Sequence, residues 1–237
     1  MSGEDLHWCD RPGVWSATCG DVELRFVGRN DAGDREAVLE RVAGDFRLDG
    51  SGSCRIPPPR LAWARQVHGA EVLAARPGLC GPGDALVTAE RGLALAIATA
   101  DCVPVLLAGR GAIAAVHAGW RGLASGVIGA ALERLASAGA GEVRAWIGPA
   151  IGPCCYEVGE EVAEAIARAG RADAVLRRDD RPRPHLDLHV AARLELASRG
   201  VSHVQALAVC TRCSPALWSY RRDGAAAGRN LSFIWLR

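Results

Sequence analysis

The 237-residue chain contains no lysine, so all 28 of its basic side chains are arginines. This absence excludes a lysine Schiff base and the phosphate-binding lysine of P-loop proteins. A charge excess is also missing, since the net charge is +1, and a broad nucleic-acid-binding face would need a basic excess. We therefore expect no nucleic-acid partner, and we expect any bound phosphate to be held by arginines or by backbone amides.

The sequence also lacks signals for export or for a membrane. No apolar segment of the kind found in signal peptides follows Met1, and the longest apolar run, residues 93–108, is interrupted by Asp101 and Pro104. An aspartate at the centre of a membrane-spanning helix costs about 3 kcal/mol, so we expect this run to be buried core. Nine cysteines without a secretory segment predict a reduced, cytoplasmic protein, and nothing in the sequence predicts a partner protein.

Hydrophobic periodicity and glycine-rich turns predict a single α+β domain over residues 1–237. Short apolar runs at 85–88, 93–98, 103–108 and 112–117, mostly separated by glycines, are typical of strands buried on both faces. Further strands are predicted at 21–27, 61–63, 71–73, 143–147 and 232–236. Helices are predicted at 34–46, 123–136, 157–169 and 187–198, with a connector at 50–59 and a charged loop at 177–184.

Three segments contain the residues most suited to chemistry. They are Gln-Val-His-Gly at 66–69, Ala-Asp-Cys-Val-Pro at 100–104 and Val-His-Ala-Gly-Trp-Arg-Gly at 116–122. His68, Cys102 and His117 would form a three-coordinate metal site with one open position, as in catalytic zinc sites. The same residues also fit a nucleophile, Cys102, with His117 or His68 as its base. Ordinary packing is the competing interpretation for each residue taken singly, and spacing alone leaves these alternatives open.

Two further motifs are weaker. Cys210-Thr-Arg-Cys213 is a CxxC pair, but the adjacent residues Cys154 and Cys155 do not have the spacing of a second zinc-knuckle pair. We interpret these as reduced cysteines in a loop near the site. His185 and His189 are four residues apart, but no glutamate follows His185 as a zinc protease requires, so we expect a helix start and a surface histidine.

Three arginine-bearing turns are candidates for binding anions. Arg121 lies just before the helix predicted at 123–136, where free backbone amides favour an anion. Arg221 and Arg229 lie in two glycine-containing turns near the C-terminus. Arginine-rich turns are often simply solvated, so the position of Arg121 beside the His117 segment makes it the strongest of the three.

Taken together, these segments resemble one bacterial family, known as polyphenol oxidase or laccase-domain proteins and also named peptidoglycan editing factor and purine nucleoside phosphorylase. The matching stretches are residues 65–69, 98–105, 115–122, 147–158, 218–223 and 228–230. The resemblance extends from about Arg60 to the C-terminus. The part up to about residue 59 is divergent, because Phe-Val-Gly-Arg-Asn at 26–30 replaces the family's Thr-Arg-x-Gly-Gly-Val-Ser stretch.

The resemblance implies an α+β fold in which mixed β-sheets are sandwiched between helices in α/β/β/α layers. It implies that His68, Cys102 and His117 bind one catalytic zinc, and we predict substrate-binding roles for Arg121, Tyr156, Arg221 and Arg229. The implied reaction is phosphorolysis of adenosine, inosine and methylthioadenosine to the free base and the sugar 1-phosphate, accompanied by adenosine deamination. We hypothesise one site that uses two nucleophiles, phosphate or hydroxide.

Two other enzyme functions are alternatives to phosphorolysis. A His₂Cys set also suits copper, which would make the protein a polyphenol oxidase, although a multicopper oxidase needs a separate multi-histidine cluster. A cysteine-type hydrolase that edits peptidoglycan precursors would use Cys102 as nucleophile and His117 as base. A non-enzymatic binding module is the third alternative, and converging reactive side chains are poor evidence for it.

Overall fold

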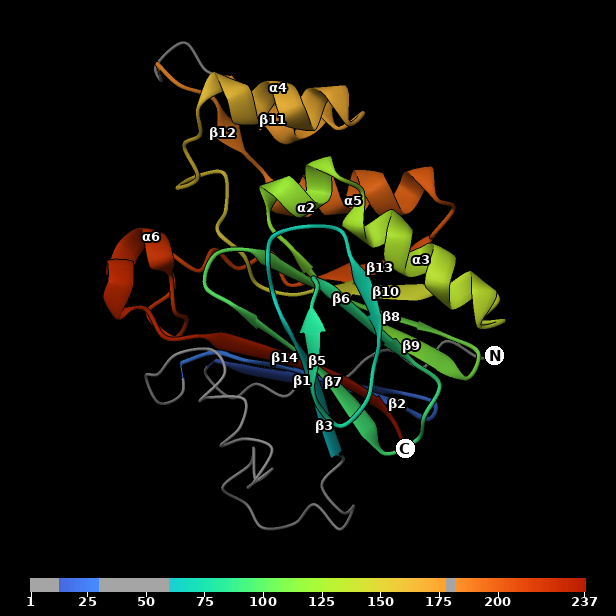
Figure 1. The fold of residues 1–237 in the computed structure, drawn as a ribbon. Coiled ribbons are helices and arrows are strands. Elements are labelled where there is room, and N and C mark those ends of the chain that lie inside the picture. Colours follow the sequence, from blue (N-terminus) through green and yellow to red (C-terminus); the bar gives the residue numbers. More distant parts are fainter. Residues whose placement is uncertain (1–12, 30–59, 178–181) are drawn as a thin grey trace.

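Two six-stranded sheets pack face to face in the computed structural model, which describes residues 13–29, 60–177 and 182–237 (Figure 1). The first sheet contains, in order, β1 (Val14–Cys19), β2 (Val22–Val27), β14 (Asn230–Leu236), β7 (Leu93–Thr99), β3 (Arg60–Arg65) and β5 (Gly78–Pro82). The second contains, in order, β13 (His203–Ala206), β10 (Arg144–Ile147), β8 (Val103–Gly109), β9 (Ala112–Ala118), β6 (Ala85–Thr88) and β4 (Val72–Ala74). A separate antiparallel pair joins β11 (Val175–Leu176) and β12 (His185–Leu186).

Both sheets are mixed. In the first, β3 pairs in parallel with β5 and β7, while the other neighbours are antiparallel. In the second, β13 is parallel to β10 and β4 is parallel to β6. Parallel neighbours need long connections, and several of these connections run from one sheet to the other.

The largest buried cluster lies between the second sheet and the helices, and a second core lies between the two sheets. This second core contains large buried side chains from both sheets, including Phe26, Ile97, Leu106, Ile113 and Trp146. Every residue of β7 and β9 is buried, and β8 is buried up to its last residue, so the prediction of strands covered on both faces is confirmed.

Three helices lie over the outer face of the second sheet (Figure 1). They are α2 (Trp120–Ala124), α3 (Val127–Ser137) and α5 (Leu188–Ser198), and α4 (Glu160–Arg168) packs against α2. The short α6 (Tyr220–Asp223) precedes β14, and two 3₁₀ turns cover Ala172–Ala174 and Gly224–Ala226. Among the described residues, no helix combines the length and apolarity needed to cross a bilayer.

The helix predicted at 123–136 is wrong as a single element. Gly126 has a φ of +79°, in the left-handed region, and divides the segment into α2 and α3. Because α2 already begins at Trp120, Arg121 lies inside its first turn and not ahead of the helix. The helix predicted at 157–169 begins only at Glu160.

The last predicted helix is confirmed. The Asp187 side chain caps α5 by accepting the Val190 N–H at 3.0 Å. The helix predicted at 34–46 and the connector at 50–59 lie outside the described residues, and so does part of the loop at 177–184. The part of the fold that is described therefore has its helical layer over one sheet only.

Two connections between the sheets decide where the site lies. The chain leaves the first sheet after β3 and enters the second at β4, and it does so again between β7 and β8. His68 lies on the first crossover and Cys102 on the second. Both turns are tight: His68 has a φ of 63° and Asp101 a φ of 99°, values that are uncommon outside glycine and cluster at functional sites.

Candidate metal centre

His68, Cys102 and His117 converge as the sequence predicts. One ligand atom from each lies within 4.8 Å of the other two. The imidazole rings meet edge to face, with their centroids 4.9 Å apart and an interplanar angle of 79°. Nitrogen and sulfur ligands of a tetrahedral zinc are about 3.3–3.8 Å apart, given bonds of roughly 2.0–2.3 Å. Small side-chain adjustments would therefore let one ion bind all three, so the donor set fits zinc.

The buried carboxylate of Asp84 organises this cluster, and sequence reasoning missed it. Its Oδ1 lies 2.8 Å from His117 Nδ1 and accepts the His68 N–H at 2.9 Å. Its Oδ2 accepts the N–H groups of Gly69 at 2.7 Å and Val67 at 3.2 Å. One side chain therefore fixes both the ring of His117 and the turn that presents His68. The available signal was an acidic residue placed directly between a glycine turn and a mostly apolar strand.

Asp84 remains ionised at neutral pH. Burial alone would raise the pKa of this carboxyl, but the hydrogen bonds from His117 and the Gly69 and His68 amides outweigh burial and hold the pKa below its ordinary value. With Nδ1 occupied by Asp84, His117 directs Nε2 to the cluster. A carboxylate–histidine pair of this kind sets the tautomer and raises the basicity of a metal-binding imidazole.

A glycine provides the space in which the ligands meet. Gly119, which precedes α2, would place a Cβ only 3.1 Å from Cys102 Sγ and 3.3 Å from His68 Cδ2. Any larger residue would press on two of the three ligands. The absence of a side chain at Gly119 therefore allows Cys102 and His68 to approach each other.

Three of the four predicted substrate-binding residues lie near the cluster. Burial, together with the charges of Cys102 and Asp101, raises the pKa of Tyr156 to about 12 against the opposing charges of Arg221 and Arg121. Tyr156 therefore keeps its hydroxyl proton at neutral pH and can donate it in a hydrogen bond. The Arg221 guanidinium lies 5.3 Å from the centroid of the Tyr156 ring.

The side chains of Arg121 and Arg229 contact residues next to them in the sequence. The Arg121 guanidinium stacks 4.3 Å from the ring centroid of its neighbour Trp120. Arg229 donates from Nη1 to the carbonyl oxygens of Ala227 and Gly228, both at 2.9 Å, and these bonds keep it on the turn before β14. The structure thus groups Arg121, Tyr156 and Arg221 through their charges, and it gives Arg229 a local role in its turn.

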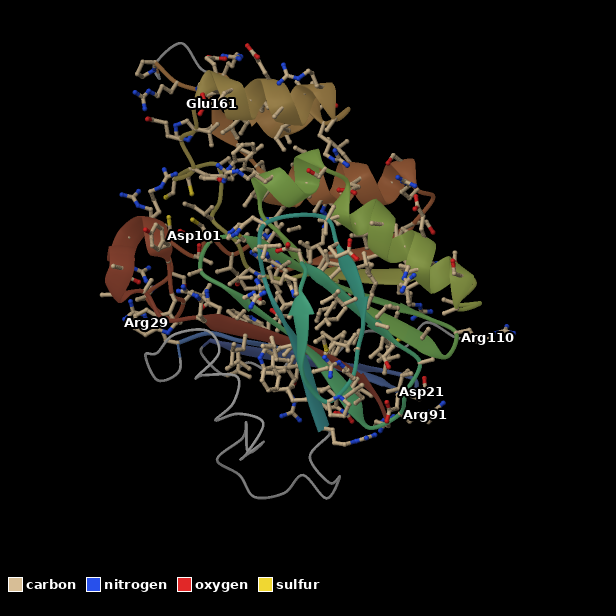
Figure 2. All side chains as sticks on the ribbon, in the orientation of Figure 1. Asp21, Arg29, Arg91, Asp101, Arg110 and Glu161 are labelled. Carbon is tan, nitrogen blue, oxygen red and sulfur yellow. The ribbon has the colours of Figure 1, made fainter. Side chains whose placement is uncertain are left out.

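Asp101 is a second residue that sequence reasoning did not single out as part of the site (Figure 2). Its Oδ1 accepts the Thr211 hydroxyl at 2.6 Å, and its Oδ2 accepts the Arg221 N–H at 2.7 Å. Its backbone carbonyl accepts the Ile151 N–H at 2.9 Å. The residue beside Cys102 therefore ties the β7–β8 crossover to three distant segments.

The expectation of a surface histidine in α5 is wrong. His185 and His189 are both buried, at 8% exposure each. His185 Nδ1 lies 2.6 Å from the Pro153 carbonyl oxygen, and His189 Nε2 lies 3.0 Å from that of Gly148. Burial lowers the pKa of His189, which keeps the ring neutral. The remaining described histidine, His203, pairs with Glu142, so the described part of the chain gathers no multi-histidine cluster.

The family model described as multi-copper polyphenol oxidoreductase laccase matches residues 31–237. The chain belongs to this family. A relative from Streptomyces coelicolor, named a purine nucleoside phosphorylase, is 42% identical over 247 residues, which cover 100% of this chain and 97% of the relative. Another of that name, from Streptomyces griseus, is 37% identical over 94% of this chain and 90% of its own.

The fold of this laccase family is also known from solved structures. The crystal structure of YlmD from Geobacillus stearothermophilus matches with a TM-score of 0.77 and 28% identity over 98% of both chains. The predicted family resemblance and the predicted single α+β domain with mixed sheets are both confirmed.

Proposed function

We propose that the protein is a zinc-dependent purine nucleoside phosphorylase. Its substrates would be adenosine, inosine and methylthioadenosine, its products the free base and ribose or methylthioribose 1-phosphate, and adenosine deamination would be a second activity of the same site. The observation that carries the proposal is the His68, Cys102 and His117 cluster, beside which Tyr156 and Arg221 lie. The names of the Streptomyces relatives support the nucleoside and phosphate substrates.

Each of the chain's own residues has a task in this reaction. When bound, zinc supplies a Lewis acid that polarises substrate oxygen. Arg121 and Arg221 bind and orient the phosphate dianion, since guanidinium groups pair bidentately with phosphate. Asp84 keeps His117 in one tautomer throughout, because its hydrogen bond occupies Nδ1.

Phosphorolysis exchanges one bond for another. A phosphate oxygen attacks the anomeric carbon through an oxocarbenium-like state, the bond from that carbon to the purine nitrogen breaks, and the base leaves with the bonding electrons. Tyr156, protonated at neutral pH, offers a hydrogen-bond donor to the departing base or the sugar. In deamination, water replaces phosphate as nucleophile, attacks the purine ring carbon that bears the amino group, and releases ammonia.

The test uses purified protein of known metal content, incubated with inosine in phosphate buffer and in phosphate-free buffer. We expect hypoxanthine and ribose 1-phosphate only with phosphate, and we expect both to disappear on chelation. Cys102→Ala and His117→Ala should lose phosphorolysis and adenosine deamination together, while Cys80→Ser, which changes a thiol outside the cluster, should keep both. Base release that survives complete metal removal would refute the zinc-dependent mechanism.

One observation favours a second candidate. The buried Asp84 carboxylate, the His117 ring and the Cys102 thiol follow one another in the order of a hydrolytic triad. In a cysteine hydrolase acting on peptidoglycan precursors, His117 would take the thiol proton and Asp84 would orient the ring. Alkylation of Cys102 that abolishes hydrolysis by metal-free protein would support this candidate. We further propose a reducing, cytoplasmic location, where the thiol of Cys102 would stay reduced.

A further inference from the structure

A second group of sulfur ligands lies apart from the His68, Cys102 and His117 centre. The Sγ atoms of Cys154, Cys155, Cys210 and Cys213 all lie within 4.8 Å of one another. Cys213 Sγ is 3.4 Å from Cys155 Sγ and 3.7 Å from Cys154 Sγ. The thiols are reduced, as the sequence predicts, but the structure also brings the two pairs together, which the spacing of Cys154 and Cys155 did not predict.

The separations match ligands of a single metal ion. With zinc–sulfur bonds of about 2.3 Å, tetrahedral geometry places the sulfurs about 3.8 Å apart. A disulfide would need about 2.05 Å, and all four thiols are free. A four-iron cluster binds each cysteine to a different iron and so spreads the sulfurs further than one ion does.

The chain brings the two cysteine pairs together through backbone contacts. Ala150 and Cys210 form a parallel β-bridge, and the Thr211 N–H donates to the Ala150 carbonyl at 3.0 Å. The Gly152 N–H donates to Cys210 Sγ at 3.2 Å, a contact that stabilises a thiolate. A Cβ on Gly152 would lie 3.2 Å from Cys210 Cβ and 3.4 Å from Cys154 Sγ, so a larger residue would crowd both cysteine pairs.

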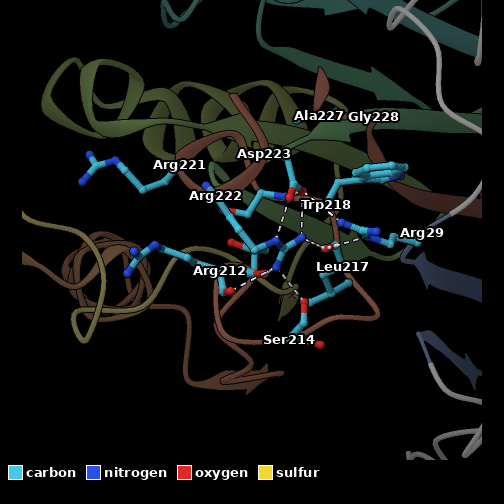
Figure 3. A network of polar contacts seen from close by, with 12 residues as sticks. Arg29, Arg212, Ser214, Leu217, Trp218, Arg221, Arg222, Asp223, Ala227 and Gly228 are labelled. Atoms are coloured by element: carbon cyan, nitrogen blue, oxygen red, sulfur yellow. Dashed lines mark hydrogen bonds and ion pairs between the residues drawn. The ribbon is translucent and has the colours of Figure 1, made fainter. Parts of the chain in front are cut away.

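Arginines hold the second pair and offset its charge. Arg222 donates from Nη1 to the carbonyl oxygens of Thr211, Arg212 and Ser214, each at 3.0 Å, and so fixes the turn between Cys210 and Cys213 (Figure 3). The Arg212 guanidinium hydrogen-bonds with Cys155. A tetrathiolate zinc site carries a net charge of about −2, which Arg212 partly neutralises. The charge of Arg222 is already paired with Asp223, so its part is to hold the turn.

We propose that Cys154, Cys155, Cys210 and Cys213 bind one zinc ion in a four-coordinate structural site. Binding releases the thiol protons and leaves no open position, so the ion serves folding and not catalysis. The site stands whether or not the proposed phosphorylase activity does. A hydrogen bond connects this site to the first centre. Thr211 lies between Cys210 and Cys213 and donates its hydroxyl to Asp101, which is next to Cys102.

The first experiment measures zinc per chain in protein purified under reducing conditions. We expect one ion for each of the two ligand clusters in the wild-type protein. Cys154→Ser and Cys213→Ser should each lose one ion, and Cys80→Ser, the matched thiol control, should lose none. Cys213→His should retain both ions, because a Cys₃His set also binds structural zinc.

A second measurement does not depend on the folding of the cluster variants. Cys102→Ala removes a ligand of the first centre only, so zinc that remains in this variant belongs to the second. Its cobalt form should show the intense visible and near-ultraviolet bands of tetrahedral cobalt thiolate. Absence of any ion from Cys102→Ala, iron together with inorganic sulfide, or a disulfide among the four cysteines would each overturn the proposal.

Discussion

The carboxylate of Asp84 is shared between His117, whose Nδ1 lies 2.8 Å from Oδ1, and the backbone N–H of His68, 2.9 Å from the same oxygen. Two ligands that are distant in sequence therefore depend on one buried side chain. Asp84→Asn keeps the shape but removes the charge and replaces one accepting oxygen with a donating amide. Because such partners orient metal ligands, we expect metal affinity to fall about 10–100-fold, as measured by competition with a chelator.

The matched control for Asp84→Asn is Asp21→Asn. Asp21 is an exposed aspartate whose Oδ2 lies 2.7 Å from Arg91 Nη2, so this change removes a surface ion pair only. Its metal affinity should equal that of the wild type. If Asp84→Asn bound metal as tightly as Asp21→Asn, the positioning role of Asp84 would be refuted.

Gly119→Ala tests the space in which the ligands meet. The added methyl would lie 3.1 Å from Cys102 Sγ and 3.3 Å from His68 Cδ2, so one ligand must shift by a few tenths of an ångström. We expect metal affinity to fall by about tenfold or more, because ligand geometry tolerates little displacement. The φ of Gly119 is −77°, so alanine causes no backbone strain, and the unfolding temperature of the metal-free protein should stay unchanged. A lower unfolding temperature of the metal-free variant would instead show that the substitution disturbs folding.

Gly126→Ala tests the break between α2 and α3. At a φ of +79° an alanine pays about 1–2 kcal/mol, while its methyl meets only Glu195 Oε1 at 3.8 Å, an ordinary contact. In a chain of this size the melting temperature should fall by roughly 2–8 °C. Gly126→Asn should cost less, since asparagine adopts left-handed conformations more readily. An alanine variant as stable as the wild type would mean that the helices can merge.

Asp223→Asn tests an electrostatic contact beside α6 (Figure 3). The hydrogen bonds from Arg222, helped by the Ser219 N–H and by Arg29, outweigh desolvation and lower the pKa of Asp223 to about 2. A depressed carboxyl pKa stabilises the fold above the unfolded pKa, near 3.8, and this stabilisation is lost as the pH falls toward 2.

At pH 7 we expect Asp223→Asn to reduce the free energy of unfolding by about 1 kcal/mol. The difference from the wild type should shrink below about pH 4 and be nearly gone near pH 2. Urea unfolding of both proteins across this range measures it. A gap that does not change with pH would show that the side chain acts through packing and not through its charge.

The sequence predicted some parts of the structure much better than others. The runs at 85–88, 93–98, 103–108 and 112–117 became β6 to β9 with ends displaced by at most one residue, because glycine turns bound most of these fully buried strands. The strands β1, β5 and β13 were missed, since each is only partly buried and has no clear apolar pattern. Gly126 was misjudged because a glycine inside an apolar helical pattern gives no sign of its φ.

The two ligand clusters show the same contrast. His68, Cys102 and His117 were predicted because each lies in a distinctive segment near a strand end. Asp84 was not, since a lone aspartate before a strand resembles any turn residue. The convergence of the four cysteines was not predicted, because the two pairs are joined by tertiary contacts across more than fifty residues and neither pair alone has a diagnostic spacing.

The crossovers between the sheets give the first cluster a mechanical consequence. His68 and Cys102 stand where the chain passes from one sheet to the other, and His117 stands at the end of a strand in the second sheet. An ion bound to all three would crosslink the two crossovers and the second sheet at the edge of the sandwich, and would resist separation of the two sheets. Metal occupancy should then raise resistance to unfolding as RT ln(1 + [M]/Kd), even in a variant that has lost all turnover.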